Sequence, residues 1–389
     1  MMKQAIIVTE NSYPEGDAGA IRQHAFAKLL SEVGYDVLVI GYGEPTDGDI
    51  CVYDGIKYIS FRENNASPWK RVWNRMLFGK NVYKFILSKY SALDVLFVVD
   101  LMPDAFRKMA LLKKKYGCVL IHDSVEWYSP EEFKNGKYNL AYRRKEYTNV
   151  KAIDAKWNVI AISEYLRSYF QGRANRVVRI PVIMDINNLD YRVEVNECER
   201  IVFSYAGGPG KKDFLKEIID GFVLLGESKR NCFELNIIGV DREQLINLCG
   251  VDETAIDALG SSLKIHGRVT RNIAINKIKE SDYSLLIRDE RLRYAQAGFP
   301  TKIVESLACG TPPLCNYSSD LSMYLVDKRN SVIVNGHTAR DVCEAVSRAL
   351  NISDKSERMQ MRKNARDLAL ACFNYTVYKD LIIKICEIE

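Results

Sequence analysis

The sequence predicts an α/β protein made of two domains, each with a parallel sheet and crossover helices. Short apolar runs alternate with segments of helical period along the whole chain, which is the pattern of parallel strands joined by helices. At 389 residues the chain is too long for one hydrophobic core, so two domains of similar size are expected. Charged residues make up 27% of the chain and apolar residues 47%, which is typical of a globular protein in water.

The first elements expected are a strand at residues 5–8, a loop at 13–19, a helix over about 20–33 and a second strand at 37–40. This order is typical of the opening of a nucleotide-binding fold. The loop does not contain Gly-x-Gly-x-x-Gly, so an NAD-dependent oxidoreductase is disfavoured.

Residues 67–85 mix aromatic and basic side chains. Trp69, Trp73, Met76 and Leu77 follow helical spacing, and lysines and arginines flank that stripe. Such a segment can lie in a membrane interface, with its apolar face in the lipid and its cations on anionic headgroups. The alternative is an amphipathic helix packed on its own domain with a solvated polar face. No module signature for RNA binding is present.

The net charge of +5 is concentrated in the first half of the chain. Residues 1–190 carry 27 basic against 22 acidic side chains, whereas residues 191–389 carry 28 of each. This asymmetry points to an acidic surface or substrate that the first half meets.

Targeting and metal-binding signals are absent from the sequence. No apolar run reaches the ~20 residues that cross a bilayer, and the first residues lack the layout of a signal peptide. The ten cysteines are scattered without a Cys-x-x-Cys pair, and no two histidines stand at ligand spacing. We therefore expect a cytoplasmic protein with reduced thiols and no metal.

A polar group follows one of the later strands of the first half. Buried strands are expected at residues 95–99 and 119–123, and the second of these leads into His122, Asp123 and Glu126. Ligands meet parallel sheets at the carboxyl ends of the strands, so these three residues are the candidates for catalysis. A histidine at a strand end can equally be a hydrogen-bonded structural group.

The second half restarts after a polar linker near residues 186–199. A strand at 201–205 is followed by a loop with Gly207, Gly208 and Lys212, where the backbone can approach a ligand closely and lysine can meet a diphosphate. The alternative is a flexible loop with lysines at its solvent tip. Arg288, after a strand at 283–287, is a second candidate cation.

The stretch from Gly298 to Pro312 is the most informative one. Pro300 suits the first helical position, and Gly310 suits the left-handed end of the helix. The amides near Thr301 then form a site for phosphate, with Lys302 in the same turn and Glu305 one turn later. The alternative is a surface helix with a normal cap.

The order Pro-x-Lys-x-x-Glu-x-x-Ala-x-Gly-x-Pro, from Pro300 to Pro312, resembles the donor-binding segment of family-four retaining glycosyltransferases (glycosyl transferases group 1). These enzymes have the GT-B fold, in which two Rossmann-like domains with parallel sheets face each other across a cleft. The resemblance implies that Glu305 holds the donor ribose and that Lys212 contacts the donor diphosphate.

Weaker resemblances extend over nearly the whole chain. Gly19 matches a glycine that approaches the donor phosphate, and Arg22 matches an arginine at the start of the following helix. Asp123 and Glu126 match an Asp-x-His-Glu segment, and Arg268 lies in a loop whose backbone meets the base in the family.

The chain also departs from the family pattern. Ala297 stands where much of the family has a first glutamate near the transferred sugar, and Val125 stands where it has a histidine. His122 is a candidate substitute for that histidine. A companion arginine expected near Gly208 is missing, and Arg288 is the candidate replacement.

The resemblance predicts three segments: an acceptor domain at residues 1–190, a nucleotide-sugar domain at 191–371, and a terminal helix at 372–389 that crosses back to the first domain. The expected donor-binding residues are Gly19, Arg22, Gly207, Gly208, Lys212, Arg268, Arg288, Pro300, Thr301, Lys302 and Glu305.

The predicted function is a retaining, metal-independent glycosyltransferase of surface polysaccharide assembly. Its donor is expected to be a nucleoside-diphosphate sugar, with UDP as the favoured nucleotide and no further cofactor. The expected acceptor is a glycan, linked to lipid, on the inner face of the cell membrane. Two alternatives remain: a nucleotide-sugar epimerase of the same fold, and a degenerate protein that binds nucleotide without turnover.

Overall fold

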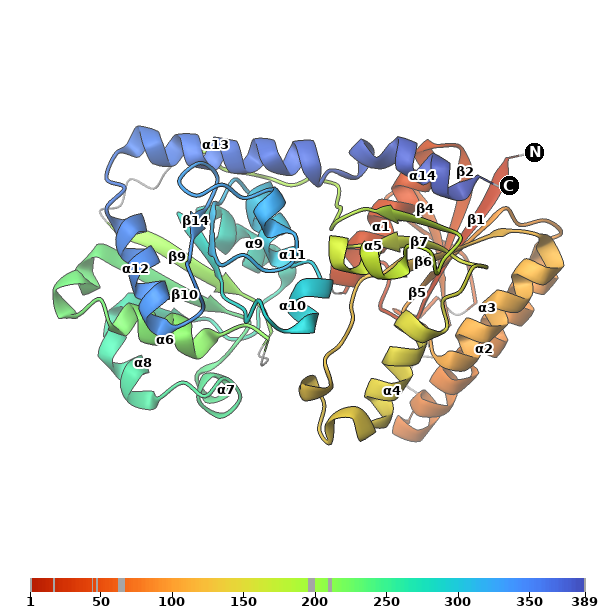
Figure 1. The fold of residues 1–389 in the computed structure, drawn as a ribbon, viewed down its shortest axis with the longest axis horizontal. Helices are drawn as coiled ribbons and strands as arrows, with labels where there is room; N and C mark the ends of the chain where they lie inside the picture. The colour runs from red at the N-terminus through yellow and green to blue at the C-terminus, as the bar shows by residue number, and fades with distance from the viewer. Residues whose placement is uncertain are drawn as a thin grey trace. The chain divides into compact units, whose positions relative to one another are not determined.

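The computed structural model describes residues 2–387 except 17, 44, 47, 62–66, 195–199 and 209–211, and gives only the backbone of residues 68–72. The chain divides into two compact units (Figure 1). Unit 1 contains Met1–Asp185 together with Tyr375–Glu389, and unit 2 contains Ile186–Asn374. The observed boundaries lie within five residues of the predicted ones, at residues 190 and 371.

Unit 1 is built on an eight-stranded sheet with the order β3-β4-β2-β1-β5-β6-β7-β8. All neighbouring strands are parallel except β3 and β4, which form an antiparallel pair at the edge. The strands are β1 (Lys3–Thr9), β2 (Tyr35–Gly41), β3 (Cys51–Tyr53), β4 (Ile56–Ser60), β5 (Val95–Val99), β6 (Val119–Ser124), β7 (Asn158–Ala161) and β8 (Arg176–Arg179).

The helices of unit 1 cover this sheet and bury its apolar residues. They are α1 (Ala18–Glu32), α2 (Pro68–Lys89), α3 (Pro103–Tyr116), α4 (Leu140–Glu146), α5 (Glu164–Phe170) and the terminal α14 (Lys379–Cys386). Ile382 and Ile385 of α14 are fully buried in the core of unit 1, and the Ile385 carbonyl accepts a hydrogen bond from Asn158 Nδ2 at 2.7 Å. The end of the chain is therefore part of the first unit.

Unit 2 is built on a six-stranded parallel sheet with the order β11-β10-β9-β12-β13-β14. Its first strand, β9, lies in the interior of the sheet, so the chain winds in both directions from it. The strands are β9 (Ile201–Ala206), β10 (Phe233–Ile238), β11 (Leu263–Ile265), β12 (Tyr283–Leu286), β13 (Pro313–Cys315) and β14 (Val332–Ile333).

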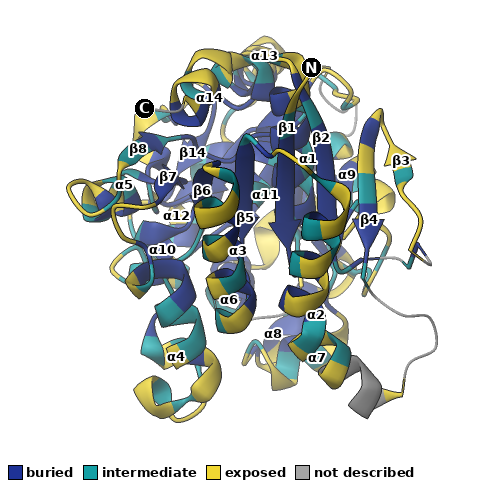
Figure 2. Ribbon diagram, turned by 90° about the vertical axis from the view of Figure 1, so that its right-hand side faces the viewer, coloured by how far each residue is buried: buried dark blue, intermediate teal, exposed yellow. Residues whose placement is uncertain are grey.

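Helices enclose the second sheet as they do the first, and the core of unit 2 contains the apolar residues of its strands. In unit 1, strands β1, β2 and β5 are mostly buried (Figure 2). The helices of unit 2 are α6 (Leu215–Val223), α7 (Arg242–Asn247), α8 (Glu253–Leu259), α9 (Arg271–Glu280), α10 (Arg293–Ala297), α11 (Thr301–Ala308), α12 (Ala339–Leu350) and α13 (Lys355–Cys372). No helix in the described part of the chain is both long and apolar enough to span a membrane.

Short helical segments complete the two units. Those of 3-10 type are Pro130–Glu132, Gly136–Tyr138, Glu227–Cys232, Gly260–Ser262, Leu321–Met323 and Tyr375–Tyr378, and Tyr147–Lys151 is a π segment that continues α4.

Candidate functional site

Glycines connect the loops at the carboxyl edge of the unit 2 sheet. The Gly207 amide donates to the Ile238 carbonyl at 2.9 Å, and the Gly239 amide donates to the Gly267 carbonyl at 2.7 Å. Gly239 has φ +94°, and a Cβ on it would lie 2.4 Å from the Gly207 carbonyl oxygen. A larger residue at Gly239 would therefore push the loops after β9 and β10 apart.

Four polar side chains meet beside this loop. The Lys302 ammonium and the Tyr205 hydroxyl both bind Asp213 Oδ2, the hydroxyl at 2.9 Å, and Lys302 Nζ also donates to the Tyr205 hydroxyl at 2.8 Å. Arg288 Nε donates to the other oxygen, Asp213 Oδ1, at 2.8 Å. One carboxylate thus holds two cations at the edge where ligands meet a parallel sheet.

Gly207 is part of the same arrangement. A Cβ on Gly207 would lie 2.1 Å from Lys302 Nζ and 3.0 Å from the Tyr205 hydroxyl oxygen. The Lys302 ammonium therefore occupies the space that a side chain at position 207 would fill.

The charges of this cluster depend on one another. Burial alone would raise the pKa of Asp213, but the charges of Lys302 and Arg288 and their hydrogen bonds hold it below its ordinary value. Burial lowers the pKa of Lys302, and the Asp213 carboxylate opposes that effect. Burial, reinforced by Asp213, raises the pKa of Tyr205, so its hydroxyl stays protonated and donates. Two cations and one anion leave the cluster with one net positive charge.

Helix α11 brings Lys302 to the cluster. Pro300 is the N-cap residue, so Thr301, and not Pro300 as predicted, is the first helical residue. The N-cap side chain makes no capping hydrogen bond to the first turn, because proline carries no polar group. Gly310 follows the helix in the left-handed conformation, with φ +71°, as predicted.

Glu305 lies one turn along α11 from Lys302. Its carboxylate accepts a hydrogen bond from Arg271 Nη2 at 2.7 Å, and 17% of its side chain is exposed. The carboxylate is thus close to the surface of unit 2 and is held by an arginine of α9.

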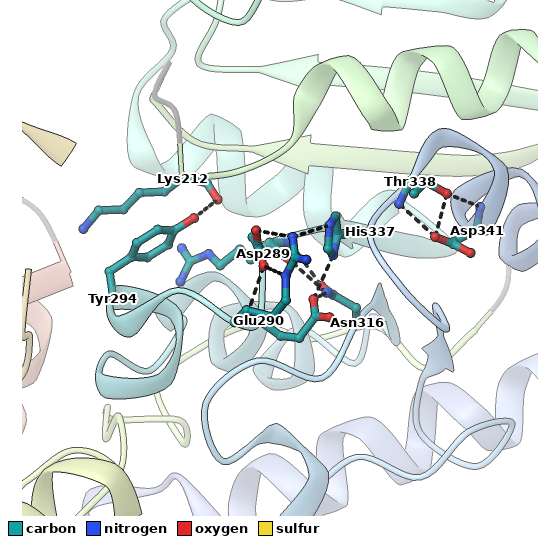
Figure 3. A network of polar contacts seen from close by, with 10 residues as sticks. Lys212, Asp289, Glu290, Tyr294, Asn316, His337, Thr338 and Asp341 are labelled. Carbon is teal, nitrogen blue, oxygen red and sulfur yellow. Dashed lines mark hydrogen bonds and ion pairs between the residues drawn. The ribbon is translucent and has the colours of Figure 1, made fainter. Parts of the chain in front are cut away.

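The remaining predicted donor residues of unit 2 lie near the cluster or on the surface. Lys212 Nζ lies 5.4 Å from the centre of the Tyr294 ring, and the Tyr294 hydroxyl donates to the Lys212 carbonyl at 3.1 Å (Figure 3). Gly208 and Arg268 are exposed. Residues 209–211 of the predicted loop lie outside the described residues.

A second polar network, which the sequence analysis did not predict, follows the carboxyl ends of β12 and β13 (Figure 3). Glu290 Oε2 accepts from Asn316 Nδ2 at 3.0 Å and lies 3.0 Å from His337 Nδ1. Asp289 forms two bonds of 2.8 Å with Arg291. One group among the described residues is close enough to hold a metal ion, namely Asp289, Glu290 and His337. Each of these side chains already interacts with another protein side chain.

In unit 1, Arg22 and Asp123 form a buried ion pair. Arg22 Nε and Nη2 each donate to Asp123 at 2.8 Å, and Nη2 also donates to the Ile180 carbonyl at 3.0 Å. Nη1 donates to the Pro181 carbonyl, and the guanidinium lies over the Phe26 ring. These partners fix the first helix to the segment after β8. Gly19 lies in the first turn of the same helix, α1.

Of the predicted cluster of His122, Asp123 and Glu126, the structure places the first two on opposite faces of the unit 1 sheet. Adjacent strand residues point to opposite faces of a sheet, so Asp123 meets Arg22, whereas His122 packs edge-on against the stacked rings of Phe106 and Trp157. Burial lowers the pKa of His122 to about 4, which keeps it neutral near pH 7. The expectation that His122 and Asp123 share one polar site is therefore wrong.

Glu126 lies in the loop after β6. It is half-buried and interacts with Tyr128. Burial, reinforced by the Glu126 carboxylate, raises the pKa of the Tyr128 hydroxyl.

Comparison with known proteins identifies the fold. Residues 228–378 match the family model described as glycosyl transferase-like. No curated protein sequence matches the chain. The family model thus covers most of unit 2, and it confirms the resemblance to group 1 glycosyltransferases over those residues.

Solved structures match over the full length of the chain. A sucrose-phosphate synthase from Thermosynechococcus elongatus is 13% identical, with 98% of both chains covered and a TM-score of 0.74. HepE of Anabaena, solved with UDP and glucose, is 13% identical, with 99% of both chains covered and a TM-score of 0.65. WaaG, a glycosyltransferase involved in lipopolysaccharide biosynthesis, is 14% identical over 98% of this chain and 99% of its own, with a TM-score of 0.68. The predicted GT-B fold is confirmed.

Proposed function

We propose that the chain is a retaining glycosyltransferase that moves a sugar from a UDP-sugar to a glycan acceptor without a metal. The observation that carries the proposal is the pair of cations, Lys302 and Arg288, held on Asp213 beside the uncapped first turn of α11. HepE, which shares the fold, was solved with UDP and glucose, and this favours UDP as the nucleotide.

The proposed reaction needs stabilisation of a leaving diphosphate. When the bond from the sugar to the diphosphate breaks, negative charge grows on the phosphate oxygens. Fixed cations and oriented amides at that place lower the barrier because they need no reorganisation. Lys302, Arg288 and the α11 amides supply such groups, and Lys212 is the further cation of the loop after β9.

Thermal melting with UDP, GDP, ADP and their sugars tests the donor proposal. A nucleotide at 100 times its dissociation constant stabilises a protein by ~2.7 kcal/mol, which is a measurable rise in melting temperature. We expect UDP and UDP-sugars to give the largest rise. Equal melting with and without every nucleotide would overturn the proposal.

Replacing Glu305 with Ala is expected to weaken UDP binding by about 10- to 100-fold, because hydrogen bonds to a charged group contribute ~1.5–3 kcal/mol. The proposed partners of the carboxylate are the ribose hydroxyls. The Glu305→Ala protein should therefore bind UDP and its 2′-deoxy form with similar affinity, whereas the parent protein should prefer UDP. Calorimetric titration measures both affinities.

Arg271→Ala is the matched control for Glu305→Ala, since it removes the protein partner of the same carboxylate. It should keep the preference for UDP over deoxy-UDP. Melting without ligand should be nearly unchanged in both variants. A large loss of melting temperature in Glu305→Ala would make this residue structural.

We further propose that unit 1 contacts an anionic membrane that carries a lipid-linked glycan acceptor. On α2, Trp73 and Met76 are 60% and 57% exposed, while Phe78, Val82 and Ile86 are fully buried on the opposite face. Leu77 is half-buried, and the side chain of Trp69 lies outside the described residues. One face of α2 thus packs on its own unit, as the interpretation as an amphipathic helix expects. The other face leaves apolar side chains exposed, as the membrane interpretation expects.

A second exposed apolar pair supports the membrane proposal. Tyr138, just before α4, and Leu140, its first residue, are 75% and 80% exposed. The basic side chains next to them, Lys134, Lys137 and Arg143, are exposed as well. Apolar side chains flanked by cations suit an interface of anionic lipid. The role in surface polysaccharide assembly rests on this surface and on the positive charge of the first half.

Replacing Trp73 and Met76 together with Ser is expected to abolish flotation with vesicles that contain anionic lipid. Flotation with purely zwitterionic vesicles should be weak already for the parent protein. Leu248→Ser, which changes an equally exposed apolar residue of unit 2, is the matched control and should float like the parent. No flotation of the parent protein with either kind of vesicle would remove the membrane proposal.

A nucleotide-binding protein without turnover is the second candidate function. Ala297, at the position of the family's first glutamate, is fully buried, and Asp123 is bound to Arg22. This candidate predicts that the protein binds a UDP-sugar but forms no free UDP from it when an acceptor is added. Product analysis of the donor incubated without acceptor distinguishes an epimerase from both candidates, because only an epimerase would convert the donor into a different UDP-sugar.

A further inference from the structure

Asp213 links residues that are far apart in the chain. Its two carboxylate oxygens bind Lys302 and Tyr205 on one side and Arg288 on the other. Only 8% of the Asp213 side chain is exposed, compared with 29% for Lys302 and 14% for Arg288. The anion is thus the inner member of the cluster, and the two cations are the outer members.

Without Asp213, the cations would lose both their alignment and part of their charge. Burial lowers the pKa of Lys302, and the nearby Arg288 guanidinium lowers it further. The carboxylates of Asp213 and Glu305 oppose these effects, and Asp213 is the one in direct contact. A covered lysine without this anion would tend to lose its proton.

Arg288 is held by its backbone as well as by Asp213. Its amide donates to Asn316 Oδ1 at 3.0 Å, and its carbonyl accepts from Asn316 Nδ2 at 2.7 Å. The residue is therefore fixed at two points, and Asp213 sets the direction of the guanidinium.

We propose that Asp213 is a positioning residue that holds the Lys302 ammonium and the Arg288 guanidinium side by side, so that a nucleoside diphosphate meets a preassembled pair of cations. This inference rests on the proposed function, because it names the group that prepares the same phosphate site. Asp213 itself touches no phosphate; it acts through the two cations.

The test is the pH dependence of UDP affinity in Asp213→Asn. The amide keeps the shape of the carboxylate and removes its charge. Binding of the diphosphate needs Lys302 protonated, so affinity falls about tenfold per pH unit above the pKa of Lys302 in the free protein. We expect this fall to begin about 1–3 pH units lower in Asp213→Asn than in the parent, since an opposite charge in contact shifts a pKa by that amount.

A second substitution shows whether the effect passes through Lys302. In Asp213→Asn combined with Lys302→Arg, the cation cannot lose its proton, and the early fall in affinity should disappear. A merely structural role of Asp213 would lower the melting temperature and leave the pH profile parallel to that of the parent. Parallel profiles, or tighter UDP binding by Asp213→Asn at every pH, would overturn the proposal.

Amine acylation read by mass spectrometry gives a measurement that needs no nucleotide. The reactivity of Lys302 is measured against pH and scaled to its own plateau, and the midpoint of that curve is compared between variants. The midpoint should fall in Asp213→Asn, which removes a negative neighbour, and rise in Arg288→Met, which removes a positive one. If Asp213→Asn does not fold, Arg288→Met still tests the proposal. An unchanged midpoint of Lys302 reactivity in that variant would overturn the charge coupling between the side chains of the cluster. If the midpoints shift as expected in the variants but the parent protein does not bind UDP, the proposed function is rejected and the coupling between Asp213 and Lys302 stands.

Discussion

Replacing Gly207 with Ala is expected to weaken UDP binding by about 100-fold. The new Cβ would lie 2.1 Å from Lys302 Nζ, so the ammonium must leave its place beside Asp213. The displaced ammonium can no longer donate to the diphosphate from that place; a hydrogen bond to a charged group contributes ~1.5–3 kcal/mol, and 100-fold corresponds to ~2.7 kcal/mol. Calorimetric titration of the parent and the variant with UDP measures the loss.

Gly208 provides the matched control for this substitution. A Cβ on Gly208 meets no atom of the described residues within 4 Å, so Gly208→Ala adds the same methyl group without moving Lys302. Its loss of affinity should be far smaller. When Lys302 is already replaced by Ala, adding Gly207→Ala should lower UDP affinity little further, because the side chain that it would displace is absent. Equal losses in the two alanine variants would show that Gly207 does not act through Lys302.

The sequence predicted the second unit better than the first, for a physical reason. The segment from Pro300 to Pro312 encodes its own structure, since the proline, the glycine and the helical spacing all act locally. Gly207, Arg288 and Lys302 were predicted as donor residues, and the structure brings them together. Whether they bind a donor stays a prediction.

Asp213 could not be recognised in advance as the centre of the cluster. Its partners Arg288 and Lys302 lie 75 and 89 residues further along the chain, and no local pattern records such pairings. The neighbouring Lys212 attracted attention because a lysine in a glycine loop suggests phosphate. In the structure, the adjacent carboxylate organises the site.

In the first unit, neighbours in sequence were mistaken for neighbours in space. His122 and Asp123 are consecutive, and a strand sends consecutive side chains to opposite faces. The alternation rule alone was sufficient to separate them. The partner of Asp123 was not predictable in the same way, because Arg22 lies 101 residues earlier.

Replacing Asp123 with Asn is expected to lower the melting temperature of the protein by about 10 °C. The change leaves the Arg22 guanidinium buried without its carboxylate, and breaking such a pair by removing one partner costs ~3–5 kcal/mol. For a unit of about 200 residues, each kcal/mol shifts the midpoint by ~2–4 °C. Differential scanning calorimetry resolves this change if the two units melt separately.

The double replacement Arg22→Met with Asp123→Leu distinguishes a structural pair from a catalytic one. Apolar residues of similar volume can replace a buried ion pair at little cost, so the double variant should be more stable than either single variant. The carbonyls of Ile180 and Pro181 lose their donors in this variant, which keeps the recovery partial. Turnover measured well below the melting temperature should stay within a few-fold of the parent in Asp123→Asn. A loss of 100-fold or more in folded Asp123→Asn would instead return this carboxylate to the catalytic site, and the ion pair with Arg22 would then serve to orient it.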